Sequence, residues 1–407
     1  MNSDKFQKFY KVVMLIILTA LITFIITTVV IKKEQNSSNI KYISVNTSDI
    51  GVKLAYYKDF IEKNYLYDID EEKMKEYAIR GYFAGLEDEY CEYISKEEMD
   101  EYMSQTIGKY VGIGVYIYNN KETNQIVVLA PMKGSPAEEV GIKPGDIILK
   151  VDGIEYKGEQ LNEASSKLKS EEGTKVKVQI QRDDEILDLE IERRSIKLNH
   201  LESKTLENDI GYIKISSFDE GCYDEFLDNY KNLKEKNIKS LIIDLRNNGG
   251  GIVDEATNIA DLFVEKGKTL LITKSKKIDE KLTLSKKDKE IDLPTIILVN
   301  GTTASSSEIL TLAIKENNDN VKVVGTRTYG KGVIQSVFKL QDGGGVKLTT
   351  EEYLSPNHNS INKEGIAPDY RIELPEDFNS SLLMLLEEKD DTQLQRAIEV
   401  LNNNNNN

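Results

Sequence analysis

The stretch TIILVNGTTASSSEILTLAIKEN, Thr295 to Asn317, defines the architecture of the larger part of the chain. Four of its first five residues are apolar and four are β-branched, which is typical of a strand buried on both faces. After the Asn300-Gly301 turn, the run has the polar start and apolar spacing of a helix. A buried strand that leads into a helix indicates a mostly parallel sheet covered by helices.

The flanking sequence repeats this pattern. Upstream, SLIIDLRNNGGG contains a second buried strand, Leu241–Leu245, followed by a glycine-rich turn and a predicted helix at 254–263. Downstream, KVVG at 322–325 is a third strand. Ligands of such sheets bind beyond the carboxyl ends of the strands, where both glycine turns fall. We therefore predict an α/β core over residues 196–380, with its site at this edge.

Composition limits the chemistry. The chain has 407 residues, a net charge of −16, two cysteines and two histidines. An acidic chain disfavours nucleic acid as a partner, because a phosphate backbone needs a basic surface. Cys91 and Cys222 form no metal or disulfide motif, and His200 and His358 lie near no triad motif. We expect no metal and no organic cofactor, and any hydrolytic chemistry must work without histidine.

The amino end contains an apolar run, Val12–Ile31, of twenty residues without a charge. This length is enough to cross a bilayer as a helix. A cleaved signal peptide is the alternative, because Lys5, Lys8 and Lys11 resemble a basic leader. The length of the run and the lack of a small-x-small cleavage site favour an uncleaved anchor. Residues 1–31 are thus predicted to be a short cytoplasmic tail and one cell-membrane span, with the rest of the chain extracytoplasmic.

Three other regions lie outside the core. Residues 32–52 are polar and rich in Ser and Asn, as in a linker. Residues 53–106 carry Tyr, Leu, Ile and Phe at helical spacing, which predicts a small helical region for packing or homodimer contact, without chemistry of its own. Residues 381–407 are predicted to form a helix followed by a disordered run of asparagines.

Residues 107–195 change to short strands and glycine turns. Here KGSPAEEVGIKPGDIILKVDG, Lys133–Gly153, combines a helix, a Pro-Gly-Asp turn and a strand. A further helix is expected at 159–168, and residues 174–182 alternate as a strand does, with Val176, Val178 and Ile180 on one face. This block resembles a PDZ domain. The chain is therefore expected to be multidomain, with an α/β part and a β-rich part.

The resemblance implies a site for the carboxyl terminus of a peptide. In PDZ domains a strand edge accepts the peptide as an extra strand, and backbone amides bind its carboxylate. In this chain the amides would come from the glycine-flanked strand start at Gly112, Ile113, Gly114 and Val115. The alternative is that Gly112 and Gly114 only serve a turn or bulge.

A lysine stands between two glycines in GTRTYGKGVIQ, Gly325–Gln335. The segment resembles a phosphate-binding loop. However, Gly332 stands where such a loop needs Ser or Thr for Mg²⁺, and the next residues have the composition of a strand rather than a helix. A nucleotide site is therefore disfavoured. Lys331 could instead serve as a base if burial or a neighbouring cation lowers its pKa.

The serines of TTASSSE allow two interpretations. Ser305 and Glu308 have the spacing of a capping box, a common way to begin a helix. Alternatively, a serine at a strand-to-helix turn is exposed above the sheet, where the first amides of the helix face developing negative charge. No GxSxG motif is present. The local sequence therefore leaves capping and catalysis open.

Four motifs follow the PDZ-like block in order. They are DLRNNGGG, NGTTASSSEI, YGKGVIQ and EEYLSPNHNSINKEGIAPD, and the tail segment DTQLQRAIEVL comes after them. In this order they resemble the carboxy-terminal processing peptidases, or tail-specific proteases, which are Ser-Lys peptidases of the S41 type. The resemblance covers the chain from about Lys53 to Leu401. It implies a serine endopeptidase that works through an acyl-enzyme.

The resemblance also implies roles for individual residues. Ser305 matches the nucleophile, Lys331 the general base, and Gln335 the residue that orients the lysine. The oxyanion hole would be formed by the backbone amides of Gly250 and Ser306.

Two positions differ from the family pattern, and the separation of Lys331 and Gln335 limits how they can interact. Ser306 replaces an alanine, and Gly249 replaces a proline. On an extended strand Lys331 and Gln335 would lie about 13 Å apart. A direct hydrogen bond between them therefore needs a turn in the intervening residues.

Together these features predict a membrane-anchored serine endopeptidase that cleaves proteins near their carboxyl termini after PDZ recognition of the tail. Its partners would be proteins or peptides with exposed carboxyl termini. The alternative is a non-catalytic PDZ scaffold that only binds tails. The joint presence of Ser305, Lys331 and Gln335 argues against that alternative.

Overall fold

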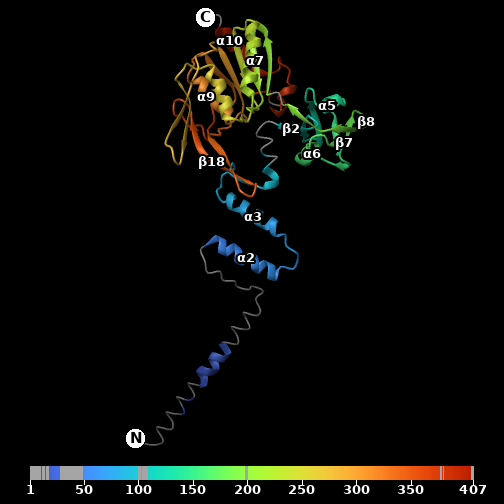
Figure 1. Cartoon of the computed structure of the whole chain (residues 1–407), viewed down its shortest axis with the longest axis vertical. Coiled ribbons are helices and arrows are strands. Elements are labelled where there is room, and N and C mark those ends of the chain that lie inside the picture. The colour runs from blue at the N-terminus through green and yellow to red at the C-terminus, as the bar shows by residue number, and fades with distance from the viewer. Residues whose placement is uncertain are drawn as a thin grey trace. The chain divides into compact units, whose positions relative to one another are not determined.

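The computed structural model describes residues 11, 14, 18–27, 49–99, 102, 109–197, 200–375, 378 and 380–404 (Figure 1). The chain divides into two compact units, Met1–Lys75 and Glu76–Asn407. Within the predicted membrane span, residues 18–27 are helical, and most of the others lie outside the described residues. In the described part of the chain, no helix combines the length and apolarity that crossing a bilayer requires.

The prediction of a helical region at 53–106 is only partly correct. Helices α2 (Ile50–Asn64) and α3 (Glu71–Ala84) are present. Glu92–Ile94, however, forms strand β1, which pairs antiparallel with β18 (Gly345–Leu354). A helical pattern in the sequence could not reveal this pairing, because the partner strand lies about 255 residues away. This segment therefore belongs to a sheet of the larger unit.

Residues 109–197 contain the predicted β-rich domain. Its antiparallel sheet has the order β3-β4-β5-β7-β8, with β6 beside β5. Val176, Val178 and Ile180 of β7 are buried in its core, as predicted. The elements are β2 (Lys109–Gly112), β3 (Val115–Asn120), β4 (Gln125–Pro131), α5 (Pro136–Glu139), β5 (Ile147–Val151), β6 (Ile154–Glu155), α6 (Leu161–Leu168), β7 (Lys175–Arg182), β8 (Glu185–Glu192) and β9 (Arg194–Lys197).

The core sheet is mostly parallel, as predicted. Its order is β10-β11-β12-β15-β16-β19, and only the β10–β11 pair is antiparallel. Every residue of β12 and β15 is buried, which explains the apolar runs within them, Leu241–Ile243 and Ile296–Val299. The strands are β10 (Leu201–Leu206), β11 (Ile210–Ile215), β12 (Ser240–Asp244), β15 (Thr295–Val299), β16 (Val321–Gly325) and β19 (Tyr370–Arg371).

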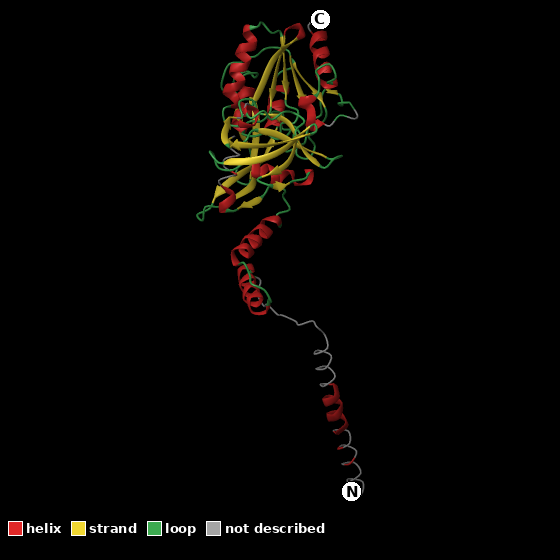
Figure 2. Cartoon of the chain, turned by 90° about the vertical axis from the view of Figure 1, so that its right-hand side faces the viewer, coloured by secondary structure: helices red, strands yellow, loops and turns green. Residues whose placement is uncertain are grey.

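Helices cover both faces of this sheet (Figure 2). One face packs against α7 (Cys222–Glu235), α8 (Val253–Asp261) and α9 (Ser306–Lys315), and the other against α10 (Thr392–Asn404). Because α10 continues through Asn404, the predicted disorder of the asparagine run is wrong for its first three residues. The last three lie outside the described residues.

A second sheet, which the sequence pattern did not separate from the first, carries the lysine segment. It contains β1, β13 (Thr269–Ser275), β14 (Lys281–Leu284), β17 (Val333–Lys339) and β18, all antiparallel. The strand predicted after Lys331 is β17. Ser305 precedes α9 on the parallel sheet, so the candidate site joins the two sheets.

Candidate active site

Ser305 occupies a strained turn between β15 and α9. Its φ and ψ are 56° and −119°, a combination that residues other than glycine rarely adopt. Such backbone strain costs about 1–3 kcal/mol. The predicted capping box is present, because the Ser305 N–H donates to Glu308 Oε2 at 2.9 Å. The cap holds the serine in a conformation that is typical of nucleophiles at strand-to-helix turns.

The next two serines have structural partners. The Ser306 hydroxyl donates to the Gly251 carbonyl oxygen at 2.8 Å, and the Ser307 hydroxyl donates to the Asn248 carbonyl oxygen at 3.0 Å. Both side chains are fully buried, whereas Ser305 is half-buried. These contacts fasten α9 to the glycine turn. Among the three consecutive serines, Ser305 is therefore the one that a substrate can reach.

The glycine turn approaches Ser305 closely. Gly250 has a φ of 104°, and a Cβ placed there would lie 2.8 Å from Ser305 Cβ, so only glycine fits. The Gly250 N–H, however, donates to Asn248 Oδ1 at 2.8 Å. The predicted oxyanion donor thus already has a partner, which it would have to exchange for an oxyanion.

Glu308 joins the serine turn to the lysine loop. Its buried carboxylate accepts hydrogen bonds from the backbone N–H groups of Ser305 (2.9 Å), Gly330 (2.8 Å) and Lys331 (3.0 Å). The Thr328 hydroxyl donates to it at 2.5 Å. One carboxylate therefore fixes the backbones that carry both predicted catalytic side chains. The sequence indicated Glu308 only as a capping residue.

Lys331 is half-buried and forms no ion pair with any residue that the structure describes. Its Nζ lies 4.6 Å from the centroid of the Tyr90 ring. Burial lowers the pKa of Lys331, and the charge of Lys347 lowers it further, while Asp88 and Glu89 act in the opposite direction. A lowered pKa is what a general base requires, because only the neutral amine can accept a proton.

Tyr90 comes from the segment that the sequence analysis expected to have no chemistry. The pairing of β1 with β18 brings it to Lys331, and its hydroxyl lies 3.5 Å from the Tyr329 hydroxyl. Burial raises the pKa of Tyr90, so the phenol stays neutral. No local signal could have identified this residue, because Tyr90 and Tyr329 are 239 positions apart.

Gln335 lies on β17 next to a β-bulge between Ile334 and Gln335. Its side-chain amide donates to Thr349 Oγ1 at 3.1 Å. In the part of the chain that the structure describes, it makes no hydrogen bond to Lys331. Gly330 provides the required turn with a φ of 87°, but this turn does not bring the two side chains into contact in this conformation.

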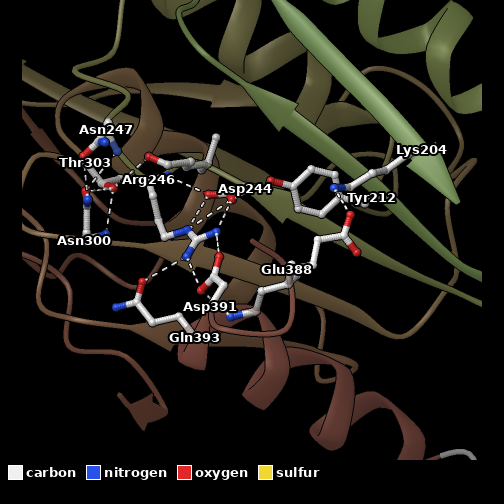
Figure 3. A network of polar contacts seen from close by, with 12 residues as sticks. Lys204, Tyr212, Asp244, Arg246, Asn247, Asn300, Thr303, Glu388, Asp391 and Gln393 are labelled. Atoms are coloured by element: carbon white, nitrogen blue, oxygen red, sulfur yellow. Dashed lines mark hydrogen bonds and ion pairs between the residues drawn. The ribbon is translucent and has the colours of Figure 1, made fainter. Parts of the chain in front are cut away.

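A second polar cluster adjoins the glycine turn (Figure 3). Arg246 forms ion pairs with Asp244 at 2.6 Å and Asp391 at 2.8 Å, and the Tyr212 hydroxyl donates to Asp244 at 2.7 Å. Burial alone would raise the pKa of Asp244, but Arg246 lowers it, so the carboxylate stays charged. These four residues line a cavity of about 290 Å³. We call these four residues the Arg246 cluster. Its ion pairs connect the start of the glycine turn to the start of α10.

The predicted carboxylate-binding residues lie where β2 leads into β3: Gly112 ends β2, Val115 begins β3, and Ile113 and Gly114 connect them. The carbonyl oxygens of Ile113 and Gly114 accept the N–H groups of Ala137 (2.8 Å) and Met132 (3.0 Å), and Gly114 has a φ of 75°. Gly112 to Val115 are buried. Among the described strands, β3 pairs only with β4. The open strand edge that peptide addition requires is therefore present beside the predicted residues.

No metal-type cluster accompanies these groups in the described residues, where no three His, Cys, Asp or Glu side chains are grouped as ligands. The arrangement of a strained serine, a lysine of lowered pKa and a glycine turn suits acyl transfer.

Comparison with known proteins shows which family the chain resembles. A model of peptidase family S41 matches residues 209–372, and a PDZ domain model matches residues 127–182. The carboxy-terminal processing protease CtpA of Bacillus subtilis (strain 168) is 35% identical over 343 residues, which cover 84% of this chain and 73% of that protein. The chain belongs to peptidase family S41.

Two further proteins are similar to this chain in sequence or structure. A probable CtpA-like serine protease of Staphylococcus aureus (strain COL) is 35% identical over 349 residues, covering 83% of this chain and 69% of the relative. The solved photosystem II D1 C-terminal processing protease is 27% identical with a TM-score of 0.52, covering 83% of this chain and 93% of that structure. The resemblance read from the four motifs is thus confirmed. This S41 chain is a serine-type peptidase of the carboxy-terminal processing group with a PDZ domain.

Proposed function

We propose that this S41 peptidase is anchored in a membrane and cleaves proteins near their carboxyl termini, after its PDZ domain has bound the tail. Ser305 Oγ attacks the scissile carbonyl carbon while Lys331 Nζ takes the hydroxyl proton. Lys331 then gives that proton to the leaving amine, and an acyl-enzyme remains. Water, deprotonated by the same amine, hydrolyses the ester and restores Ser305.

The observation that supports this mechanism most strongly is the role of Glu308. Because its carboxylate binds the backbone N–H groups of both Ser305 and Lys331, nucleophile and base are held by one buried group. Fixed relative placement of reacting groups supplies a large share of enzymatic rate enhancement. The lowered pKa of Lys331 adds the neutral amine that the first proton transfer needs.

Two hydrogen bonds would have to change partners to complete the site. The Gly250 N–H would leave Asn248 Oδ1 and turn to the oxyanion, next to the Ser306 N–H at the start of α9. Removing one such donor typically lowers kcat about 10²- to 10³-fold. Gln335 would leave Thr349 and orient Lys331. In this proposal, the described conformation is a resting state.

Recognition of the substrate tail is proposed for the PDZ domain. The open edge of β3, next to the turn at Gly112 to Val115, supports it. A peptide with a free carboxyl terminus should be cleaved about tenfold faster, or more, than its amidated twin, because charged hydrogen bonds are lost on amidation. Equal rates would show that this domain does not read carboxyl termini.

The membrane anchor is proposed from the uncharged run Val12–Ile31. A reporter that is active only outside the cytoplasm, fused after Asn407, should give a signal. A signal only from a cytoplasmic reporter would contradict this topology.

Cleavage itself is tested by incubating the chain with an unfolded protein and sequencing the fragments by mass spectrometry. Wild type should cut near the carboxyl terminus, and Ser305→Ala should not cut. Ser306→Ala should stay active, since the Ser306 hydroxyl only donates to Gly251. Activity in Ser305→Ala, with loss in Ser306→Ala, would reassign the nucleophile. Tail binding by wild type without any cleavage would favour the scaffold alternative.

A further inference from the structure

Strand β17 has an open edge beside the candidate catalytic lysine. It begins at Val333, two residues after Lys331, and pairs with β18 along one edge. Among the strands that the structure describes, none pairs with its other edge. An unpaired strand edge presents rows of N–H and C=O groups that can bind another extended chain.

The hydrogen bonds at the end of the hairpin show which groups face outward. The Leu340 N–H donates to the Gly344 carbonyl oxygen at 2.9 Å, so this pair bonds across the hairpin. Backbone bonding alternates along an antiparallel strand, so Phe338 and Ser336 also bond to β18. The N–H and C=O groups of Val337 and Lys339 therefore point toward the open edge.

This edge carries little of the usual protection against pairing with other chains. Natural edge strands are protected by charges, prolines or bulges, whereas β17 contains no proline and carries a single charge, Lys339 at its last position, and a single bulge, at Ile334 and Gln335. Phe338 and Tyr329 leave about half of their aromatic surfaces exposed, 49% and 50%. The bulge at Ile334 and Gln335 bends the strand where it leaves the lysine loop, and such bulges often lie next to active sites.

We propose that an extended segment of the substrate adds to the β17 edge as an extra strand, paired with the outward backbone groups of Val337 and Lys339, and that this pairing delivers the scissile carbonyl to Ser305. The proposal rests on the proposed proteolytic function. The strand begins two residues after Lys331, and Val337 lies about 20 Å from Lys331 along the extended chain, a distance that about six substrate residues span. This continuity with the lysine loop favours a substrate over a second copy of the chain. Backbone pairing depends little on sequence, which suits an enzyme that must thread an unfolded tail through its site.

Proline substitution tests the edge. Val337→Pro removes one outward N–H but no bond to β18, and proline is tolerated on edge strands at such positions. Leu282→Pro is the matched control. It lies on β14 at the opposite edge of the same sheet, it is 51% exposed, and its N–H points outward because the Ser285 N–H bonds inward to Lys268.

Two substrates are compared with the full-length chain: unfolded casein, and p-nitrophenyl acetate, which is too small to pair with a strand. Val337→Pro should lower the ratio of casein kcat/KM to ester kcat/KM about tenfold, the upper range for one hydrogen bond. Leu282→Pro should leave the ratio at the wild-type value. An unchanged ratio in Val337→Pro would overturn the β17 proposal but leave the Ser305 mechanism standing. Failure of wild type to hydrolyse either compound would instead overturn the proposed function.

A second measurement needs no enzyme variant, so it holds even if Val337→Pro fails to fold. Peptide substrates methylated at one backbone nitrogen at a time should be cleaved slowly and rapidly in alternation, with a period of two residues. Strand pairing requires this period, because every second N–H faces the partner. Slowing without a two-residue period would contradict the proposal. If wild type dimerises in analytical ultracentrifugation, and Val337→Pro is monomeric but keeps the wild-type ratio of casein to ester hydrolysis, the edge binds a second copy of the chain and the proposal is wrong.

Discussion

The Arg246 cluster and the Ser305–Lys331 site both adjoin the turn at 247–251. Each contains a basic side chain that is at least partly buried. Arg246 is almost fully buried, and two carboxylates pair with it. Lys331 is half-buried, and an aromatic ring rather than a carboxylate lies against its amine. As a result, the pKa of Arg246 is raised and the pKa of Lys331 is lowered.

The difference in charge pairing suits Arg246 to stabilising the fold and Lys331 to proton transfer. A fully paired buried charge is costly to disturb but cannot exchange protons. An unpaired, partly buried amine gives up some stability and gains an accessible neutral form. The positive φ of Ser305 belongs with the second pattern, because strain is kept where the serine must be presented. The turn therefore links a cluster that fixes the fold to a site that performs the reaction.

Lys331→Met should abolish proteolysis without destabilising the fold. Proteolysis should fall about 10⁴-fold or more, as for other members of catalytic units. The free energy of unfolding, measured with urea, should stay the same or rise, because a poorly solvated charge is removed. Lys331→Arg is the charged control, and it should also be inactive because arginine stays protonated. An active arginine variant would rule out the general-base role.

Arg246→Met should give the opposite result. It leaves Asp244 and Asp391 buried without their cation, which costs about 3–5 kcal/mol of unfolding free energy. Urea unfolding monitored by circular dichroism measures the loss. Activity should decline only in proportion to the folded fraction at the assay temperature. A variant as stable as wild type, yet inactive, would mean that Arg246 serves the reaction rather than the fold.

The sequence predicted the strands around both clusters and proposed Ser305 and Lys331, where the signal is local, but it gave no indication of the Arg246 cluster. The buried runs at 241–245 and 295–299 predicted β12 and β15, because continuous apolar sequence is what a strand covered on both faces requires. The residues after Lys331 likewise predicted β17. The four ordered motifs located Ser305 and Lys331.

The groups that surround these residues could not be predicted. Tyr90 reaches Lys331 only through the distant pairing of β1 with β18. Glu308 matched a local capping box, and three of its four hydrogen-bond donors come from the lysine loop. Periodicity and capping rules describe contacts within one element. They contain no information on which remote loop will meet that element.

Lys347→Gln should change the charge near Lys331 without altering Ser305 or Lys331 itself, and it also removes the ion pair of Lys347 with Glu92 at 2.9 Å. The charge of Lys347 lowers the pKa of Lys331, so its removal should raise that pKa. Proteolysis increases with pH as Lys331 loses its proton, and the midpoint of the pH–kcat/KM curve should move to higher pH with the plateau retained. A midpoint that stays in place would show that the curve reports another group.

The same shift has a consequence for stability. Since the pKa of Lys331 is lower in the folded than in the unfolded chain, the unfolded chain binds more protons between the two values. The contribution of Lys331 to stability should therefore rise with pH across that window. Urea unfolding at a series of pH values should show a smaller rise in Lys331→Met than in wild type.

Gly249→Ala should have the smallest effect. Gly249 lies in the turn that both clusters adjoin, has no positive φ, and a Cβ there would meet nothing within 4 Å. Alanine should raise the free energy of unfolding by about 0.4–1 kcal/mol, because it restricts the unfolded chain. Thermal unfolding measures the change, and proteolysis should persist. A destabilised variant would mean that the turn needs the freedom of glycine at this position.

Activation of Ser305 by Lys331 can be measured by covalent labelling of the serine. The chain is treated with a fluorophosphonate, digested, and the labelled residue is found by mass spectrometry. We expect the adduct on Ser305 alone, formed faster as pH rises, and absent from Lys331→Met under the same conditions. An adduct on Ser306 or Ser307 would rule out Ser305 as the nucleophile, and equal labelling of Ser305 in Lys331→Met would rule out its activation by Lys331.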